Sequence, residues 1–262
     1  MKIDLTGKVA LVSGSTQGIG KAAALAMAKS GATIVLLARN KEKLISVAAE
    51  LPTPSSQKHQ YLVADFSLPN QLKSVISGWL RDGNHADILV NNTGGPKGGA
   101  IASAPVEEFI AAFNQHLICN HILVQALLPK MKENRFGKII NVISTSVKQP
   151  LPQLGVSNTI RGAVGNWSKT LANELGPFNI TVNNVLPGAT NTERLKGIAE
   201  NKSHLTQDSV DSIFETMASE SPMQRIAEPE EIAQAILFLA SPMSSYVNGI
   251  NIPVDGGRTK SL

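Results

Sequence analysis

The sequence predicts a single doubly wound α/β domain, in which a seven-stranded parallel sheet is flanked by helices. Two observations predict this fold: seven short apolar runs that end in small or polar residues, and helix-length amphipathic stretches between them. Apolar and β-branched runs without strict alternation are typical of strands that are buried on both faces. The intervening stretches are long enough for the crossover helices that parallel strands require.

Each predicted element follows from this pattern in chain order. The strands are KVALVSG (8–14), TIVLLAR (33–39), QYLVA (60–64), DILVNN (87–92), KIINVIS (138–144), ITVNNVLPG (180–188) and INIPVDGG (250–257). Helices are predicted between them, and the two longest cover residues 105–133 and 156–175. The segment 190–227 is rich in Asn, Ser and Glu. We expect it to be a mostly irregular lid with a short helix near 209–218.

Length, composition and charge restrict the number of domains and the class of partner. A chain of 262 residues with 42% hydrophobic content suits one large core, so residues 1–262 are expected to form one domain. The net charge of +4 is scattered along the chain, which argues against nucleic-acid binding. The single cysteine, Cys119, cannot form an internal disulfide, and no Cys/His cluster has metal-ligand spacing. Without a signal peptide or membrane span, a cytoplasmic protein that binds no metal is expected.

A glycine-rich turn follows the first predicted strand. The segment SGSTQGIG contains Gly14, Gly18 and Gly20, and it precedes the helical stretch KAAALAMAKSGA. Glycines at such a turn let the backbone approach a pyrophosphate, and the N-terminus of the following helix presents unpaired N–H groups to it. The segment therefore predicts a dinucleotide site of the Rossmann type. The alternative is a tight strand-to-helix turn that binds nothing.

The spacing G-x-x-x-G-x-G resembles that of the short-chain dehydrogenase/reductase family. Further segments agree in order, namely ADFS, NNTG at 91–94, NVIS ending at 144, PGATNT from 187 and VDGG at 254–257. The resemblance covers the whole chain and implies an oxidoreductase that acts on a carbonyl or a secondary alcohol, with 3-oxoacyl thioester reduction as the commonest bacterial assignment. It also implies a homo-oligomer, a dimer or a tetramer, paired through the two longest helices and the last strand.

The resemblance also implies which residues hold the nucleotide. The pyrophosphate would lie among Gly14, Ser15, Gln17, Gly18, Ile19 and Gly20, the adenine at Asp65 and Phe66, the adenosine ribose at Asn92, Thr93 and Gly94, and the nicotinamide end at Pro187, Gly188 and Thr192. For Asp65 an alternative stays open, because a carboxylate at this position also caps the helix that follows.

The end of the second strand distinguishes between the two nicotinamide dinucleotides. An acidic residue there accepts hydrogen bonds from the ribose 2′-hydroxyl of NAD(H) and repels a 2′-phosphate. This chain has Arg39 and Asn40 instead. A guanidinium binds phosphate in a bidentate manner, so NADP(H) is predicted as the preferred cofactor and NAD(H) as the second candidate. The alternative is a solvated arginine, and Gln17 supplies no second basic residue in the glycine turn.

The catalytic positions of the family are mostly replaced in this chain. In the family, a tyrosine follows the catalytic serine by thirteen residues, and a lysine follows four residues later. Counted from Ser144, these steps fall on Ser157 and Arg161, and the usual asparagine position falls on His116. Of the four family residues, only Ser144 is kept.

These replacements leave the proton donor open. Reduction of a carbonyl leaves an alkoxide that needs a proton, and a serine hydroxyl is a far weaker acid than a phenol. Ser157 would therefore orient a carbonyl, while Arg161 stays protonated and would bind ribose hydroxyls. His116 and Lys148 are the candidate donors, with a packed polar histidine and a solvated loop lysine as the alternatives.

Two function classes follow from this sequence. The first is an NADP(H)-dependent oxidoreductase that acts on a small-molecule substrate. The second is a nucleotide-binding sensor or assembly protein that has lost its chemistry. The intact glycine turn favours nucleotide binding in both cases, and the missing tyrosine and lysine do not decide between them.

Overall fold

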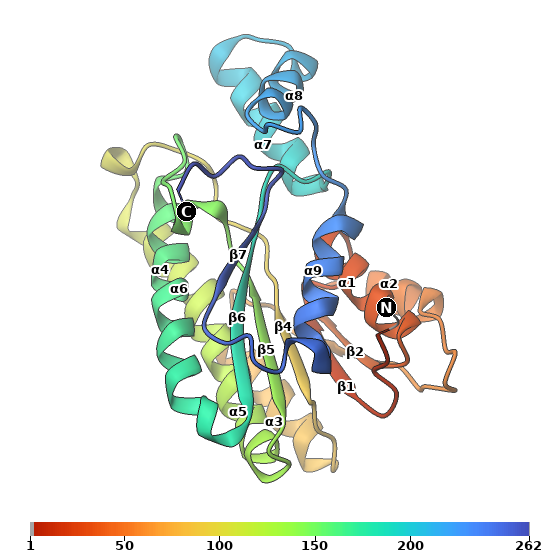
Figure 1. Ribbon diagram of the computed structural model, residues 1–262. Helices are drawn as coiled ribbons and strands as arrows, with labels where there is room; N and C mark the ends of the chain where they lie inside the picture. The colour runs from red at the N-terminus through yellow and green to blue at the C-terminus, as the bar shows by residue number, and fades with distance from the viewer. Residues whose placement is uncertain (1–2, 262) are drawn as a thin grey trace.

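Residues 3–261 are described in a computed structural model, and they form a seven-stranded parallel sheet between two layers of helices (Figure 1). The strands are β1 (Val9–Ser13), β2 (Thr33–Ala38), β3 (Gln60–Val63), β4 (Ile88–Asn91), β5 (Gly137–Val142), β6 (Ile180–Pro187) and β7 (Asn251–Val254). Their order is β3-β2-β1-β4-β5-β6-β7, and every neighbouring pair is parallel. The predicted fold class is confirmed, and each predicted strand lies where the sequence indicated.

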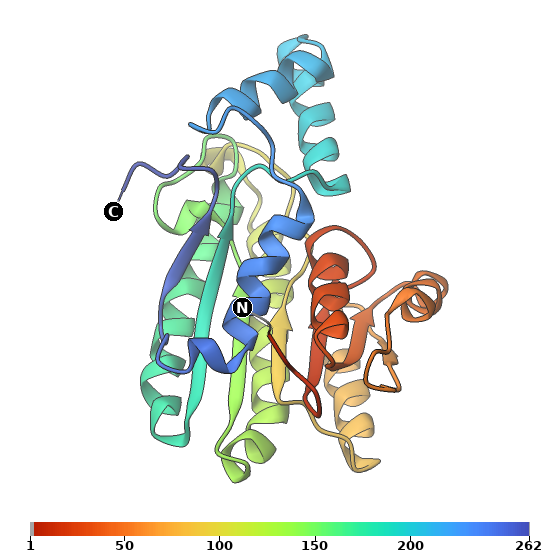
Figure 2. The same cartoon turned by 45° about the vertical axis from the view of Figure 1, so that its right-hand side comes forward.

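Helices cover both faces of the sheet (Figure 2). They are α1 (Gly18–Lys29), α2 (Lys41–Glu50), α3 (Pro69–Arg81), α4 (Val106–Phe113), α5 (Cys119–Glu133), α6 (Gly155–Leu175), α7 (Glu193–Thr206), α8 (Val210–Ser219) and α9 (Pro229–Ala240). Single turns add η1 (Ile101–Ser103), η3 (Thr145–Val147), η4 (Gly176–Phe178) and η5 (Pro242–Ser244), and the π-helical η2 (Asn114–Ile118) joins α4 to α5. No helix within residues 3–261 is long and apolar enough to cross a membrane.

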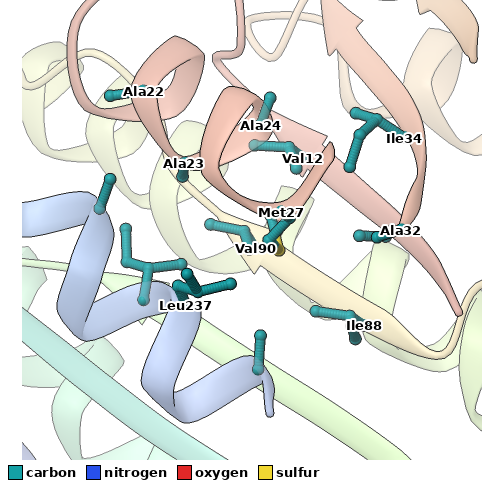
Figure 3. Packing of buried hydrophobic residues seen from close by; sticks show 14 of the residues in the cluster. Val12, Ala22, Ala23, Ala24, Met27, Ala32, Ile34, Ile88, Val90 and Leu237 are labelled. Carbon is teal, nitrogen blue, oxygen red and sulfur yellow. The ribbon is translucent and has the colours of Figure 1, made fainter. Parts of the chain in front are cut away.

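Two apolar cores lie on opposite faces of the sheet. On one face, Val12 of β1 and Val90 of β4 pack with Met27 of α1 and Leu237 of α9 (Figure 3). On the other face, residues such as Leu11 pack with α3, α5 and α6. Because successive side chains of a strand point to opposite faces, a central strand needs an apolar residue at nearly every position. This requirement explains why the apolar runs in the sequence do not alternate.

The edge strand β3 departs from the predicted burial on both faces. Tyr61 and Val63 are 37% and 36% exposed. β3 pairs with β2 alone, so its free edge and part of both its faces are open to solvent. Its apolar residues therefore resemble those of the central strands in sequence, whereas their environment differs.

The segment 190–227 is more regular than predicted. It contains α7, a helix of 14 residues that the sequence pattern did not indicate, as well as α8 close to the expected short helix. Thr192 begins α7 by accepting the Leu195 N–H at 3.3 Å, and Leu195 and Ala199 are buried. These two buried residues hold a helix whose other residues are mostly polar. α7 and α8 stand above the carboxyl ends of the strands (Figures 1 and 2), where a lid function stays a prediction.

Candidate functional site

The glycine turn lies at the carboxyl end of β1, between β1 and α1. Gly14 and Gly18 have φ angles of +59° and +52°, in the left-handed region that glycine adopts without strain. A Cβ atom on Gly20 would meet the backbone oxygen of Gly14 and would lie 2.6 Å from Nδ2 of Asn92. The side chain of Gln17 does not cap α1, so the N–H groups of its first turn are left for a ligand. This turn fits the pyrophosphate of a dinucleotide.

Two of the predicted nucleotide contacts use their side chains to build this turn. Asn92 Nδ2 donates to the backbone oxygens of Ser13 at 3.3 Å and Gly14 at 3.2 Å. Ser15 is fully buried, and its Oγ accepts the N–H of Leu37 at 3.0 Å. The main chain of Ser15, rather than its hydroxyl, is therefore left for a phosphate. The turn brings together the predicted pyrophosphate residues Gly14, Ser15, Gln17, Gly18, Ile19 and Gly20.

A surface pocket of about 450 Å³ lies at the carboxyl ends of β2 and β3. Its lining residues are Arg39, Asn40, Glu42, Val63, Ala64, Asp65, Leu68 and Gln71. Arg39 directly follows β2 and Asp65 closely follows β3, so the cation and the carboxylate face one pocket. Both residues line this one pocket, and their contact with the adenosine end of the cofactor stays a prediction.

Asp65 and Phe66 are held by their own local structure. Asp65 Oδ1 accepts the N–H of Ser67 at 2.8 Å. This backbone hydrogen bond, with smaller contributions from the Ser67 side chain and the charge of Arg39, holds the pKa of the carboxyl below its ordinary value. The bond closes the turn before α3. The N-cap residue of that helix is Leu68, so Asp65 does not occupy the capping position. Phe66 is buried in the core with α3 and α5, and its backbone oxygen accepts a hydrogen bond from the thiol of Cys119 at 3.3 Å.

Of the predicted nicotinamide residues, Thr192 lies beside the glycine turn, while Pro187 and Gly188 lie at the end of β6. Pro187 ends β6, and Gly188 is so close to the chain after β7 that an added Cβ would lie 2.7 Å from Cα of Asp255. The methyl group of Thr192 would lie 2.9 Å from a Cβ on Gly18. The start of α7 and the start of α1 are therefore neighbours, as a single dinucleotide spanning both would require.

The candidate catalytic serines come from two elements. Ser144 follows β5, and its Oγ accepts the N–H of Ser146 at 3.1 Å, which caps η3. Lys148 ends the same turn and is half-buried. Ser157 lies in the first turn of α6, and its exposed fraction is only 9%. Hydroxyl groups in these two places are suited to hydrogen-bond a substrate oxygen.

Arg161 lies one turn after Ser157 and is buried, so the alternative of a surface arginine is wrong. Its exposed fraction is 8%, and its Nη1 donates to the backbone oxygen of Val142 at 2.9 Å. Burial, followed by the nearby charge of Arg194, lowers the pKa of Arg161 to about 10. The guanidinium is still protonated at neutral pH, and it brings a buried positive charge to the carboxyl end of β5.

His116 lies in the π-helical segment η2 and is 1% exposed. Its Nδ1 lies 2.6 Å from Oγ1 of Thr93, and its buried Nε2 has no hydrogen-bond partner within the described part of the chain. Burial, followed by the charges of Arg161 and Arg194, holds the pKa of His116 well below 6.5. The imidazole is therefore neutral at neutral pH. Its buried surroundings, with two nearby arginines, oppose a role as proton donor. Gly94, next to Thr93, faces open space.

Arg194, in the first turn of α7, belongs to this site although the sequence did not single it out. Its Nη2 donates to the backbone oxygen of Pro96, and the same atom would lie 3.2 Å from a Cβ on Gly95. Burial lowers the pKa of this guanidinium. The only sequence signal was its position two residues after Thr192. An arginine within a polar stretch is more typical of a solvated surface.

Comparison with known proteins gives consistent results over the whole chain. The family described as enoyl-(acyl carrier protein) reductase matches residues 14–259. The 3-oxoacyl-[acyl-carrier-protein] reductase FabG of Thermotoga maritima is 35% identical over 97% of this chain and 98% of its own. The NADPH-dependent reductase BacG of Bacillus subtilis is 30% identical over 98% of this chain and 100% of its own.

Among solved structures, the L-sorbose reductase of Gluconobacter frateurii, complexed with NADPH and L-sorbose, has a TM-score of 0.93. The two sequences are 33% identical, and the match covers 100% of both chains. Both the sequence matches and this structure include the glycine turn, the strands that end at the site and the segment that carries α7. The chain therefore belongs to the short-chain dehydrogenase/reductase family of oxidoreductases.

Proposed function

We propose that this protein is an NADP(H)-dependent oxidoreductase that interconverts a small-molecule carbonyl compound and its secondary alcohol. The observation that carries the cofactor preference is the position of Arg39, directly after β2 and in the lining of the pocket at that edge. A guanidinium there binds the 2′-phosphate that distinguishes NADP(H) from NAD(H). Similar proteins support this preference, because BacG of Bacillus subtilis is named NADPH-dependent and the L-sorbose reductase was crystallised with NADPH.

The glycine turn and the start of α7 would hold the cofactor across the carboxyl edge of the sheet. The N–H groups at the start of α1 face a pyrophosphate, while Pro187, Gly188 and Thr192 form the far end of the site. When bound, NADPH supplies a hydride to the carbonyl carbon of the substrate.

The residues near β5 would then orient and stabilise the substrate oxygen. Ser144 and Ser157 carry hydroxyls that can hydrogen-bond a carbonyl, and Arg161 brings a buried positive charge to the same region. Such a charge stabilises a developing alkoxide strongly, because it acts away from water. His116 is neutral and Arg161 retains its proton, so Lys148 or solvent is the remaining source of the proton.

The proposed activity is tested by following NADPH oxidation with a panel of carbonyl substrates, in which 3-oxoacyl thioesters, simple ketones, ketoses and oxo acids are compared. Sustained oxidation with at least one class supports the oxidoreductase. NADPH binding without turnover of any class would contradict it and would favour the nucleotide-binding sensor. A parallel titration with NADH tests the cofactor preference on the same protein.

We further propose that the protein acts as a homo-oligomer, a dimer or a tetramer, in the cytoplasm. Val106, Ile110 and Phe113 of α4 are apolar and exposed by 66%, 56% and 39%. Exposed apolar residues that share a helix are typical of a surface that another protein chain covers. Light scattering coupled to size-exclusion chromatography measures the number of copies, and a monomer at micromolar concentration would contradict the proposal.

A further inference from the structure

Three basic side chains meet at the carboxyl ends of two neighbouring strands. Arg161 hydrogen-bonds the backbone at Val142, the last residue of β5. Arg194 and His116 contact residues that closely follow β4, namely Pro96 and Thr93. β4 and β5 are adjacent and in register, with Asn91 opposite Asn141. Side chains from η2, α6 and α7 therefore converge on one small region of the site.

This region contains positive charge without a matching carboxylate. None of the ion pairs formed within residues 3–261 includes Arg161 or Arg194. Burial and the charges of the two arginines lower the pKa values of Arg161, Arg194 and His116. No acidic side chain contributes to these shifts. An uncompensated charge is costly to bury, so this arrangement is stabilised when an anion enters.

The same region has unused hydrogen-bonding capacity. Each arginine donates one Nη to a backbone oxygen, which leaves the other donors of its guanidinium for a ligand. His116 adds a buried Nε2 that has no partner in the described chain. Guanidinium groups bind carboxylates and phosphates through paired hydrogen bonds, so both the charge and the donors point to an oxyanion.

The pyrophosphate of the cofactor is not the best match for the Arg161 side of this region. The glycine turn belongs to β1, and β4 separates β1 from β5 in the sheet. Arg161 and Val142 therefore lie on the β5 side, next to Ser144, where the proposed function places the substrate. The N-terminus of α1 supplies the donors for the pyrophosphate on the opposite side of β4.

We propose that the substrate of this enzyme carries an oxyanion group, a carboxylate or a phosphate, which Arg161 and Arg194 hold while the carbonyl lies at the serines. This inference rests on the proposed function and assigns its substrate class. Neutral ketones and sugars leave both guanidinium groups unpaired, so they bind weakly. Arg194 belongs to α7 and contacts Pro96 after β4. An anionic substrate bound by Arg194 therefore also contacts the proposed lid segment.

The test compares acidic and neutral probes of matched size by calorimetry, in the presence and in the absence of NADP⁺. The pairs are 2-oxobutanoate with butan-2-one, and dihydroxyacetone phosphate with dihydroxyacetone. We expect at least one acidic probe to bind tenfold or more tightly than its neutral partner. The pair that shows the larger ratio distinguishes a carboxylate substrate from a phosphate ester.

Variants of the two arginines assign the effect to this site. Arg194→Gln is expected to weaken binding of the acidic probe by about 10- to 100-fold, because a charge-assisted contact is lost, while NADPH affinity changes by less than about threefold. Arg161→Lys keeps the charge at the buried position and is expected to weaken binding less than Arg161→Gln does. Arg81→Gln, an exposed arginine at the end of α3, is the matched control and leaves binding unchanged.

The outcomes separate the inference from the proposed function. Equal affinity for acidic and neutral probes, or no binding of either acid, overturns the anionic substrate class even if NADPH binds and is oxidised with a neutral substrate. If Arg194→Gln weakens NADPH as much as it weakens the acid, the arginine belongs to the cofactor site, and the inference fails. Failure to bind NADPH contradicts the proposed function alone, because the acidic probes are also titrated without cofactor.

Discussion

The two halves of the site at the carboxyl edge of the sheet are built from different chemical groups. Around β1 and β2, the site consists of main-chain N–H groups, glycines with left-handed backbone angles and one exposed arginine, Arg39. Around β4 and β5, it consists of buried side chains from η2 and α6 and a half-buried arginine from α7. The first half provides a backbone surface for a nucleotide, and the second half provides concentrated positive charge.

The comparison indicates that backbone geometry constrains the sequence of the first half, whereas the side chains of the second half determine the chemistry. The glycine turn needs its residues in one short segment, since a Cβ at Gly20 would overlap the backbone of Gly14. The charged half depends on Arg161 and Arg194, which belong to separate helices and meet only after folding. A family can therefore keep the first half while the second half changes its catalytic groups.

The largest expected effect comes from returning the charged half to the family pattern. We expect Ser157→Tyr combined with Arg161→Lys to raise the rate of simple ketone reduction by about 10²- to 10⁴-fold, because a phenol beside a cation supplies the missing acid. NADPH affinity should stay nearly unchanged, since the glycine turn is not altered. Initial rates of NADPH oxidation with butan-2-one measure the change.

Arg161→Lys alone is the control for this double variant, because it keeps Ser157 and adds no acid. If the wild-type protein already reduces simple ketones at the rate of relatives that retain tyrosine, with Lys148→Ala and His116→Asn equally active, the site has a competent acid and this prediction is wrong.

The second prediction tests the backbone half. Gly20→Val places side-chain atoms against the Gly14 oxygen and Asn92 Nδ2, so the turn must open. We expect NADPH affinity to fall by at least about 100-fold and the free energy of unfolding to fall by about 1–3 kcal/mol, as for other overpacked sites. Fluorescence titration and urea unfolding measure the two effects.

The matched control for Gly20→Val is Gly197→Ala, because Gly197 is exposed within α7 and has open space around its Cβ position. Alanine there should keep NADPH affinity and add up to about 1 kcal/mol of stability through helix propensity. Unchanged NADPH affinity in Gly20→Val would show that the glycine turn is not the nucleotide site.

The third prediction concerns Arg39, the exposed arginine of the backbone half. Arg39→Ala should weaken NADPH binding by about 10- to 100-fold and leave NADH binding almost unchanged, because only the 2′-phosphate contact is lost. Parallel titrations with both cofactors give the ratio. Arg81→Ala, at the far end of α3, is the control. Equal affinities of the wild-type protein for the two cofactors would remove the basis for the NADP(H) preference.

The sequence predicted the fold and the backbone half of the site because both depend on local patterns. Apolar runs of strand length identified all seven strands, and glycine spacing identified the turn before α1. Burial was harder to predict, since β3 has the same apolar composition as the central strands and yet lies at the edge with Tyr61 exposed. α7 was missed because its sequence is mostly polar, and Leu195 and Ala199 are the buried residues among those of its side chains that the structure describes.

The charged half could be predicted only in part. Spacing from Ser144 led to Ser157 and Arg161, and the family's asparagine position led to His116. The structure places Arg161 and His116 near each other. Their burial, and the arrival of Arg194 from α7, depend on contacts between segments that are far apart in the chain. The protonation state of His116 depends on these contacts, which is why histidine was a reasonable candidate for the proton donor by residue type alone.

The smallest expected effect tests whether His116 is neutral in the folded protein. Burial among two arginines lowers its pKa below the ordinary value of 6.5, so the unfolded chain takes up this proton first as the pH falls. The free energy of unfolding should therefore decrease as the pH falls below about 6.5, by at most about 1.4 kcal/mol per pH unit for one proton. His116→Asn removes this titration, so its stability should depend less steeply on pH between 6.5 and 5.

Urea unfolding at pH 7.5, 6.5 and 5.5 measures the slope, and comparison of slopes rather than absolute values removes the packing change that the substitution introduces. His204→Asn, an exposed histidine of α7, should retain the slope of the wild-type protein. If His116→Asn also retains it, His116 takes up a proton in the folded protein as readily as in the unfolded chain. The charged half would then contain a titrating acid close to Thr93, and His116 would return as the candidate that protonates the substrate oxygen.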